Sequence, residues 1–302
     1  MKLTYFQGDP PNFGDELNAT MWRSLLPDTF FDDDSDVLFL GIGSIIQDIY
    51  PANARKVVVG SGFAGAYSSM PNVHDGTWDI RFVRGPQTCK ALDLNPDLAV
   101  TDAAVLLRAT HLPEPAKGIG TAFMPHYESI ERGNWEEVCR LAGVHFIDPT
   151  KPTETILSEI RGADMVITEA MHGAIVSDAL RTPWVGVKTM HHVHRTKWFD
   201  WAGSLGIDYR PAALRPSNGR EAWAFHTGRW GNGPRARAVF DSTAFKPANM
   251  AILHRSASSL RKLKASDPQL SKECAIERAT NRAMEAVDHL VSDYNVRKSV
   301  TA

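Results

Sequence analysis

The feature that most constrains the fold is an alternation of short apolar runs with amphipathic segments along the first two thirds of the chain. Runs such as Val37–Leu40 and Met165–Thr168 have the length and composition of buried strands, and Thr153–Arg161 repeats apolar residues at helical spacing. Strands that alternate with helices are typical of βαβ units and a parallel sheet. The pattern therefore predicts an α/β protein.

The alternation occurs twice, on either side of a Pro-containing stretch at 111–117. In the first half it predicts strands at 2–6, 37–40, 56–59, 80–83 and 98–101, with helices at 15–26 and 86–94. In the second half it predicts strands at 121–124, 144–147, 165–168 and 184–187, with helices at 135–141, 153–161 and 173–180. We expect two Rossmann-like domains, at 1–115 and 116–205, facing across a cleft in a GT-B-like arrangement.

The last hundred residues follow a different pattern. Residues 214–237 are rich in Gly, Pro, Trp and Arg and are predicted to be loop. Helices are expected at 250–263 and 268–291, the second with Asp267 as its N-cap before Pro268. We interpret 206–302 as an Arg-rich loop and a helical tail packed on the α/β body.

Composition excludes several classes of protein. The 302 residues are 43% hydrophobic and 23% charged, with a formal net charge of −2. These values are typical of a globular chain and give no overall attraction to nucleic acid. The sequence has no apolar run of signal-peptide or membrane-spanning length. Three scattered cysteines without CxxC spacing favour a reducing compartment, so we expect a cytoplasmic protein without disulfides.

Polar side chains gather at the predicted strand ends, where open α/β sheets bind their ligands. In the first half these are Asn12 and Asp15, which lead into a helix, then Ser44 directly after Gly43, then Arg84 and Asp102. In the second half they are His126, Glu169, His172 and Lys188. Cationic or titratable groups at several ends of both sheets suggest a cleft that binds an anion.

Two of these residues indicate specific chemistry. Arg84 precedes a helix expected to begin at Pro86, and a guanidinium beside helix N–H groups suits a carboxylate or a phosphate. The alternative is a surface arginine lying over the sheet edge. His172 lies in a tight turn before Gly173, where an imidazole could transfer protons. Its alternative is a histidine that stabilises the turn by hydrogen bonds.

Three other motifs have simpler interpretations. Gly60–Gly65 matches GxGxxG, but the residues that follow do not open a helix, so we do not expect a dinucleotide cofactor. His191, His192 and His194 suggest a metal, yet no acidic residue lies in the same stretch, and no metal is expected. The arginines of 215–237 belong either to a solvated loop or to a contact for a phosphate-bearing acceptor or anionic lipid.

Taken in order, the motifs resemble those of the polysaccharide pyruvyltransferase family, most closely its rhizobial succinoglycan-type members that add a ketal-linked pyruvate. The resemblance covers residues 8–190 and excludes the helical tail. It is carried by Asn12–Glu16, Leu40–Ser44, Val83–Thr88, Thr101–Asp102, Ser158–Asp164 and Met171–Ile175.

This resemblance implies a GT-B-like enzyme that uses phosphoenolpyruvate and no cofactor. It implies that His172 is catalytic and that Arg84 binds the anionic pyruvate donor. Many family members carry an arginine where this chain has Ala170. Other cations must then contribute to donor binding, and Arg84, Lys188 and His126 are the candidates.

The expected reaction transfers pyruvate to a sugar of an exopolysaccharide precursor. Asp15 or Glu169 would orient an acceptor hydroxyl, while Asn12, Gly43 and Ser44 complete the expected binding site. The acceptor would be a lipid-linked oligosaccharide or polysaccharide, with peripheral contact to the inner membrane through the Arg-rich loop and tail. Two alternatives stay open: a GT-B glycosyltransferase using a nucleotide sugar, and a non-catalytic partner in polysaccharide assembly.

Overall fold

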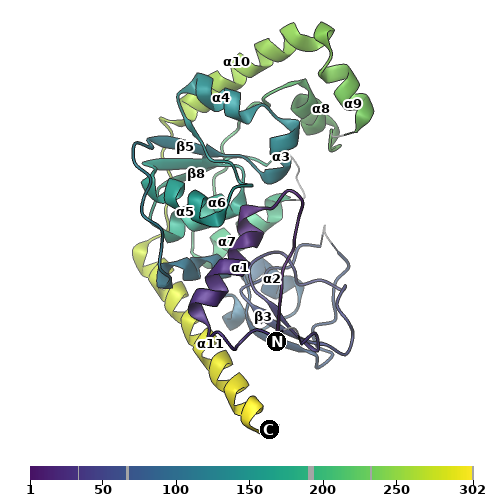
Figure 1. Ribbon diagram of the computed structural model, residues 1–302, viewed down its shortest axis with the longest axis vertical. Coiled ribbons are helices and arrows are strands. Elements are labelled where there is room, and N and C mark those ends of the chain that lie inside the picture. Colours follow the sequence, from purple (N-terminus) through teal and green to yellow (C-terminus); the bar gives the residue numbers. More distant parts are fainter. Residues whose placement is uncertain (33, 66–67, 190–193, 232, 301–302) are drawn as a thin grey trace.

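The computed structural model describes residues 1–32, 34–65, 68–189, 194–231 and 233–300, the last six of these by their backbone alone. It is a mixed α/β protein with two parallel four-stranded sheets and a long C-terminal helix (Figure 1). The α/β class predicted from the alternating pattern is confirmed.

The first sheet has the order β1-β2-β3-β4, with every pair parallel. Its strands are Lys2–Thr4, Val37–Leu40, Arg55–Val59 and Trp78–Phe82; α1 is Phe13–Leu25 and α2 is Pro86–Ala91. Among the residues described between β2 and β4, no helix connects the strands. This sheet therefore departs from a regular βαβ pattern.

The strand predicted at 98–101 is wrong. Short 3₁₀ helices occupy this part of the chain, η1 at Pro96–Leu98 and η2 at Ala103–Ala109, and Ala99 forms only an isolated bridge. Asn95 and Asp102 accept hydrogen bonds from backbone N–H groups two residues further on. Such side-chain caps favour turns over a strand.

The second sheet has the order β6-β5-β7-β8, again all parallel. Its strands are β5 Thr121–Met124, β6 His145–Phe146, β7 Met165–Thr168 and β8 Trp184–Gly186. The helices are α3 Tyr127–Arg132, α4 Trp135–Ala142, α5 Thr153–Gly162 and α6 Met171–Ala179. From β5 the chain first adds β6 on one side and then β7 and β8 on the other, so the strand order reverses between β5 and β7. The segments after these two strands therefore border the crevice that such sheets use for ligands.

The remaining helices are α7 Arg195–Ser204, α8 Gly219–Thr227, α9 Pro234–Phe240, η4 Thr243–Phe245, α10 Lys246–Leu263 and α11 Glu273–Val300. Because α8 lies within 214–237 and α9 begins there, the loop predicted for that stretch is wrong. Asn218 caps α8 by accepting from the N–H of Glu221 at 2.9 Å, and Gly228 ends it at φ 69°. The helix at 250–263 is confirmed, but α11 begins too late for Asp267 to cap it.

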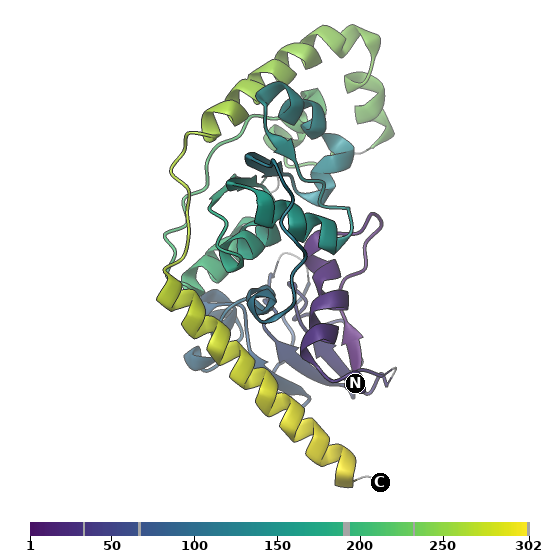
Figure 2. The same ribbon diagram turned by 60° about the vertical axis from the view of Figure 1, so that its left-hand side comes forward.

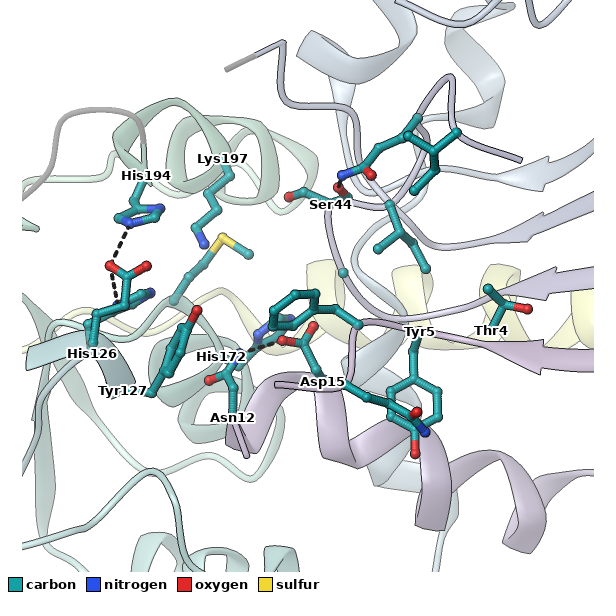
Figure 3. A pocket seen from close by; sticks show the side chains of 18 of the residues that line it. Thr4, Tyr5, Asn12, Asp15, Ser44, His126, Tyr127, His172, His194 and Lys197 are labelled. Atoms are coloured by element: carbon teal, nitrogen blue, oxygen red, sulfur yellow. Dashed lines mark hydrogen bonds and ion pairs between the residues drawn. The ribbon is translucent and has the colours of Figure 1, made fainter. Parts of the chain in front are cut away.

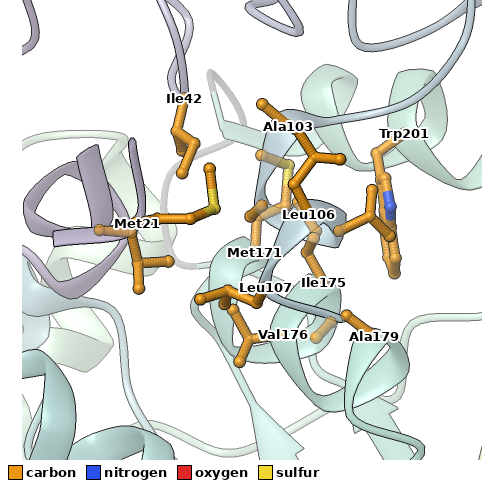
Figure 4. Close-up of a cluster of buried hydrophobic side chains, with 14 of the residues drawn as sticks. Met21, Ile42, Ala103, Leu106, Leu107, Met171, Ile175, Val176, Ala179 and Trp201 are labelled. Atoms are coloured by element: carbon orange, nitrogen blue, oxygen red, sulfur yellow. The ribbon is translucent and has the colours of Figure 1, made fainter. Parts of the chain in front are cut away.

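One apolar cluster joins the two halves (Figure 4). The buried 3₁₀ helix η2 contributes Leu106 and packs against Ile175 of α6, with Met21 of α1 and Trp201 of α7 in the same cluster. The two halves therefore share a core. Burying each side chain of this size stabilises the folded state by about 1.5–3 kcal/mol.

The two long C-terminal helices lie against different halves. α10 packs on α4 beside the second sheet, whereas α11 returns to β4 and η2 of the first (Figure 2). Within the described residues, no helix combines the length and the apolar character needed to cross a membrane.

Candidate active site

A cavity of about 810 Å³, the main cavity, is lined by segments from both halves (Figure 3). Six of the nine residues expected at the site line it: Asn12, Asp15, Gly43, Ser44, His126 and His172. Arg84, Glu169 and Lys188 are not on its wall. Polar residues on the wall that the sequence did not suggest include Gln47, Tyr127, Glu128 and Lys197.

His172 lies in the first turn of α6, with its ring against the start of α1. A Cβ atom at Gly14 would lie 1.8 Å from Nδ1 of His172, so only glycine permits this approach. The glycine of the Asn12–Glu16 motif is thus explained by a contact with a residue more than 150 positions away.

Asp102 faces the other nitrogen of this ring. Oδ2 of Asp102 lies 3.8 Å from Nε2 of His172, and neither atom makes a hydrogen bond in the part of the chain described. The Asp102 side chain is fully buried, and its Oδ1 accepts from the N–H of Ala104. Because buried polar atoms normally find partners, this pairing suits an imidazole held by a carboxylate.

Asp15 projects from the first turn of α1 into the main cavity. Asn12 donates a hydrogen bond to its Oδ2 at 2.6 Å. Burial raises the pKa of Asp15, while the Asn12 hydrogen bond and the nearby His172 and Lys197 oppose the rise. Asp15 is therefore a carboxyl group with a reduced tendency to ionise, close to the histidine.

Lys197 reaches the cavity from α7, a helix that the sequence pattern did not predict. The residue is half-buried. Burial and, to a smaller extent, the charge of Arg84 lower the pKa of Lys197 to about 8 against the opposing effect of Asp15. A desolvated cation on a cavity wall attracts anions strongly.

Arg84 is fully buried behind the cavity, and its partner is a carboxylate of the protein itself. Nε of Arg84 donates to Oδ2 of Asp200 at 3.1 Å. The same carboxylate accepts from the N–H groups of Gln87 and Thr88 at 2.8 and 3.0 Å and from the Thr88 hydroxyl at 2.6 Å. The sequence predicted an anion beside Arg84 and the start of α2, and Asp200 occupies that place.

Arg84 still affects the cavity indirectly. Its Nη1 donates to the hydroxyl of Ser44 at 2.7 Å, and Ser44 lines the wall. Asp200 and Lys197 are three residues apart on α7, so the ion pair fixes the helix that carries Lys197.

Glu169 and Lys188 lie away from the wall. The Glu169 side chain is buried, and its Oε2 accepts from the N–H of His126 at 3.0 Å and from the Ser129 hydroxyl at 2.8 Å. It therefore stabilises the start of α3, which carries His126. Lys188 is exposed beyond β8, where its N–H donates to Ala212.

His126, Glu128 and His194 form a buried to half-buried cluster on the cavity wall. Glu128 lies 3.4 Å from Nδ1 of His126 and 3.2 Å from Nε2 of His194. Burial lowers the pKa of His194 to about 4. Burial alone would raise the pKa of Glu128, but hydrogen bonds from both histidines hold it well below its ordinary value.

Two histidines and a glutamate are ligand types compatible with a metal ion, but the ring geometry is not. The two imidazoles are stacked at 4.6 Å with planes 28° apart. Their lone pairs lie in the ring planes, and nearly parallel planes at this separation do not meet within a metal–nitrogen bond of about 2.1 Å. The cluster fits hydrogen bonding to Glu128 better. His191 and His192 lie outside the described residues.

Comparisons with known proteins show the family of this chain. Residues 12–191 match the family model described as polysaccharide pyruvyl transferase. The chain is 32% identical over 320 residues to the succinoglycan biosynthesis protein ExoV of Rhizobium meliloti (strain 1021), covering 97% of this chain and 100% of that protein. No solved structure matches. The matched region contains His172, Asp15 and the other cavity residues between 12 and 191, and the chain belongs to the polysaccharide pyruvyl transferase family.

Proposed function

We propose that this pyruvyltransferase takes pyruvate from phosphoenolpyruvate and forms a ketal on a sugar of an exopolysaccharide precursor. The observation that carries this proposal is the grouping of His172, Asp15 and Lys197 around one cavity. The similarity to a protein named for succinoglycan biosynthesis supports an exopolysaccharide acceptor.

Phosphoenolpyruvate carries a carboxylate and a phosphate, and the proposed site receives it with Lys197. This lysine takes the place of the arginine that many family members have where this chain has Ala170. Ser44, held by Arg84, donates a second contact. Asn12 and His126 lie on the same wall. Arg84 supports the site from behind through Ser44 and through the Asp200 pair that fixes α7.

The proposed reaction needs two proton movements. One sugar hydroxyl attacks C2 and loses its proton, and C3 gains this proton to become a methyl group. The C2–O bond to phosphate then breaks, and a second hydroxyl closes the ketal while its proton leaves with phosphate. His172, with Nε2 facing Asp102, moves these protons, and Asp15 orients the hydroxyl. Lys197 stabilises the departing phosphate.

The domain division at 1–115, 116–205 and 206–302, with a GT-B-like cleft, is part of this proposal. Two separate parallel sheets and a cavity lined from both halves support it. The shared core and the return of α11 to the first sheet favour limited hinge motion over freely moving domains. Work in the cytoplasm, at the inner face of the membrane, would bring the enzyme to a lipid-linked acceptor.

Thermal melting with millimolar phosphoenolpyruvate, UDP-galactose or GDP-mannose tests the pyruvate donor. Phosphoenolpyruvate alone should raise the melting temperature, because a ligand that binds only the folded state stabilises it. Protection should be lost in Lys197→Met and kept in Lys188→Met, the matched variant off the cavity wall. Protection by a nucleotide sugar alone would instead support a glycosyltransferase.

A further inference from the structure

A second cavity, of about 570 Å³, lies between α8 and α9. We name it the Trp–Arg groove after the side chains that dominate its wall, Trp223, Arg229, Trp230, Arg235 and Phe240. Trp230 also lines the main cavity, so the two cavities share a wall. The groove therefore adjoins the place where we locate pyruvate transfer.

The composition of the groove is aromatic and cationic. The rings of Trp223 and Phe240 have centroids 6.5 Å apart, and Cζ of Arg229 lies 5.9 Å from the Trp223 ring. Trp230 leaves 49% of its surface exposed. Among the described residues, the lining includes two arginines and no acidic side chain. Aromatic faces suit the C–H faces of sugar rings, and arginine forms paired hydrogen bonds with phosphate.

Hydrogen bonds connect the groove rigidly to the main cavity. Arg132, at the end of α3, donates to the carbonyl of Trp230 at 3.1 Å, and Arg220 of α8 donates to the carbonyl of Glu131 at 3.0 Å. The same short helix begins beside His126 of the main cavity. Figure 1 shows α3 beside α8 and α9. The groove thus has a fixed position relative to the reacting centre.

Buried contacts also anchor α8. The Glu221 carboxylate accepts from Nε1 of Trp135 in α4 at 2.8 Å and from the N–H and hydroxyl of Ser217 at 2.7 and 2.6 Å. These bonds distinguish α8 from the solvated loop that the sequence suggested. Because these hydrogen bonds fix α8, the wall of the groove that it forms can be a preorganised binding surface.

We propose that the Trp–Arg groove binds the phosphate-bearing saccharide of the acceptor. A sugar ring lies on Trp230 and Trp223, Arg229 and Arg235 hold the phosphate, and the sugar to be modified extends past Trp230 into the main cavity. This inference rests on the proposed function and names the acceptor chemistry. The groove lies outside residues 12–191, which match the family model, so acceptor recognition is added to the shared catalytic core.

A phosphate-bearing saccharide fits better than a membrane surface. The aromatic rings line a concavity that adjoins the main cavity, and a flat bilayer would not enter it. The charge of the groove serves either ligand, but the shared Trp230 wall is useful only to a molecule that reaches both cavities.

Fluorine NMR of protein containing 5-fluorotryptophan tests the proposal. The chain has eight tryptophans, and Trp223→Phe and Trp230→Phe assign the two resonances of interest. Glucose 1-phosphate should shift both resonances saturably, and more than glucose or inorganic phosphate does. Arg229→Ala/Arg235→Ala should weaken this binding about tenfold or more. Arg210→Ala, which removes an exposed arginine paired with Asp208, should leave it unchanged.

Three outcomes would overturn the groove assignment: no shift of either resonance, an equal response to phosphate alone, or a response only to phosphatidylglycerol vesicles. Protection by phosphoenolpyruvate is measured on the same sample. Protection without groove shifts contradicts the acceptor site alone, whereas groove shifts without protection contradict the pyruvate donor alone.

Discussion

Helix α7 contributes one residue to each of two polar clusters, Lys197 and Asp200, which are three positions apart. The two clusters differ in what surrounds them. Asp200 faces Arg84 and the start of α2, where hydrogen bonds of 2.6–3.1 Å occupy its carboxylate. Lys197 faces the main cavity, where a ligand can approach it. We call the first cluster, Arg84 and Asp200, the closed cluster, because the protein's own carboxylate fills it. We call the second, Lys197 with His172 and Asp15, the open cluster, because it borders the main cavity.

The difference shows how to separate structural charges from those that bind ligands. A buried charge that is paired with an opposite charge stabilises a particular packing, and removing one partner leaves the other buried without compensation for its lost hydration. A desolvated charge on a cavity wall reduces stability but binds an anion strongly. Arg84 and Lys197 should therefore respond to substitution in opposite ways.

The largest effect should come from the open cluster. His172→Gln should reduce turnover by about 10²–10⁴-fold, because a positioned acid–base group typically contributes this much. The assay measures the rate of phosphate release from phosphoenolpyruvate that depends on added acceptor. His254→Gln changes an exposed histidine of α10 and should retain full activity. Near-normal turnover in His172→Gln would show that another group moves the protons.

The next effect tests the closed cluster. Arg84→Ala should lower the free energy of unfolding by about 3–5 kcal/mol, because Asp200 stays buried without its cation. Lys197→Met should leave the free energy of unfolding unchanged or raise it at pH 7. Urea denaturation compares the two variants. If both lose stability equally, the distinction between closed and open clusters fails.

Asp102 belongs with the open cluster as a positioning residue. Asp102→Asn should lower kcat about tenfold or more and shift the pH profile of kcat, because a neutral amide replaces the carboxylate charge that lies 3.8 Å from Nε2 of His172. Protection by phosphoenolpyruvate should remain. Loss of protection together with kcat would indicate a collapsed cavity rather than a misplaced imidazole.

The smallest effect concerns pH. Because burial lowers the pKa of Lys197 to about 8, the lysine is charged below that pH and loses its charge above it. The Kd for phosphoenolpyruvate should therefore rise about tenfold per pH unit above 8. Lys197→Arg stays charged and should give a flat profile between pH 7 and 10. Calorimetric titration measures both, and matching profiles would remove Lys197 from the donor site.

The sequence by itself determined the features that depend on residues close together in the chain, such as strands and helix caps. Apolar runs predicted the second sheet strand by strand, because a buried parallel strand needs only a short β-prone segment. The strand-end rule placed His172, Asp15 and Ser44 on one cavity, since parallel strands end at a common edge. The capping residues Asn218 and Glu221 also marked α8 in the sequence, although the density of Gly, Pro and Arg obscured that signal.

Tertiary structure decided which charges meet. The sequence predicted that Arg84 binds a ligand, but in the structure Arg84 pairs with Asp200, 116 residues away. Glu128 lies 66 residues from His194, so the search for an acid within the histidine stretch missed it. Local patterns specify secondary structure, because backbone geometry is local. The partner of a buried charge depends on which helix packs against it, and that is settled only when the whole core forms.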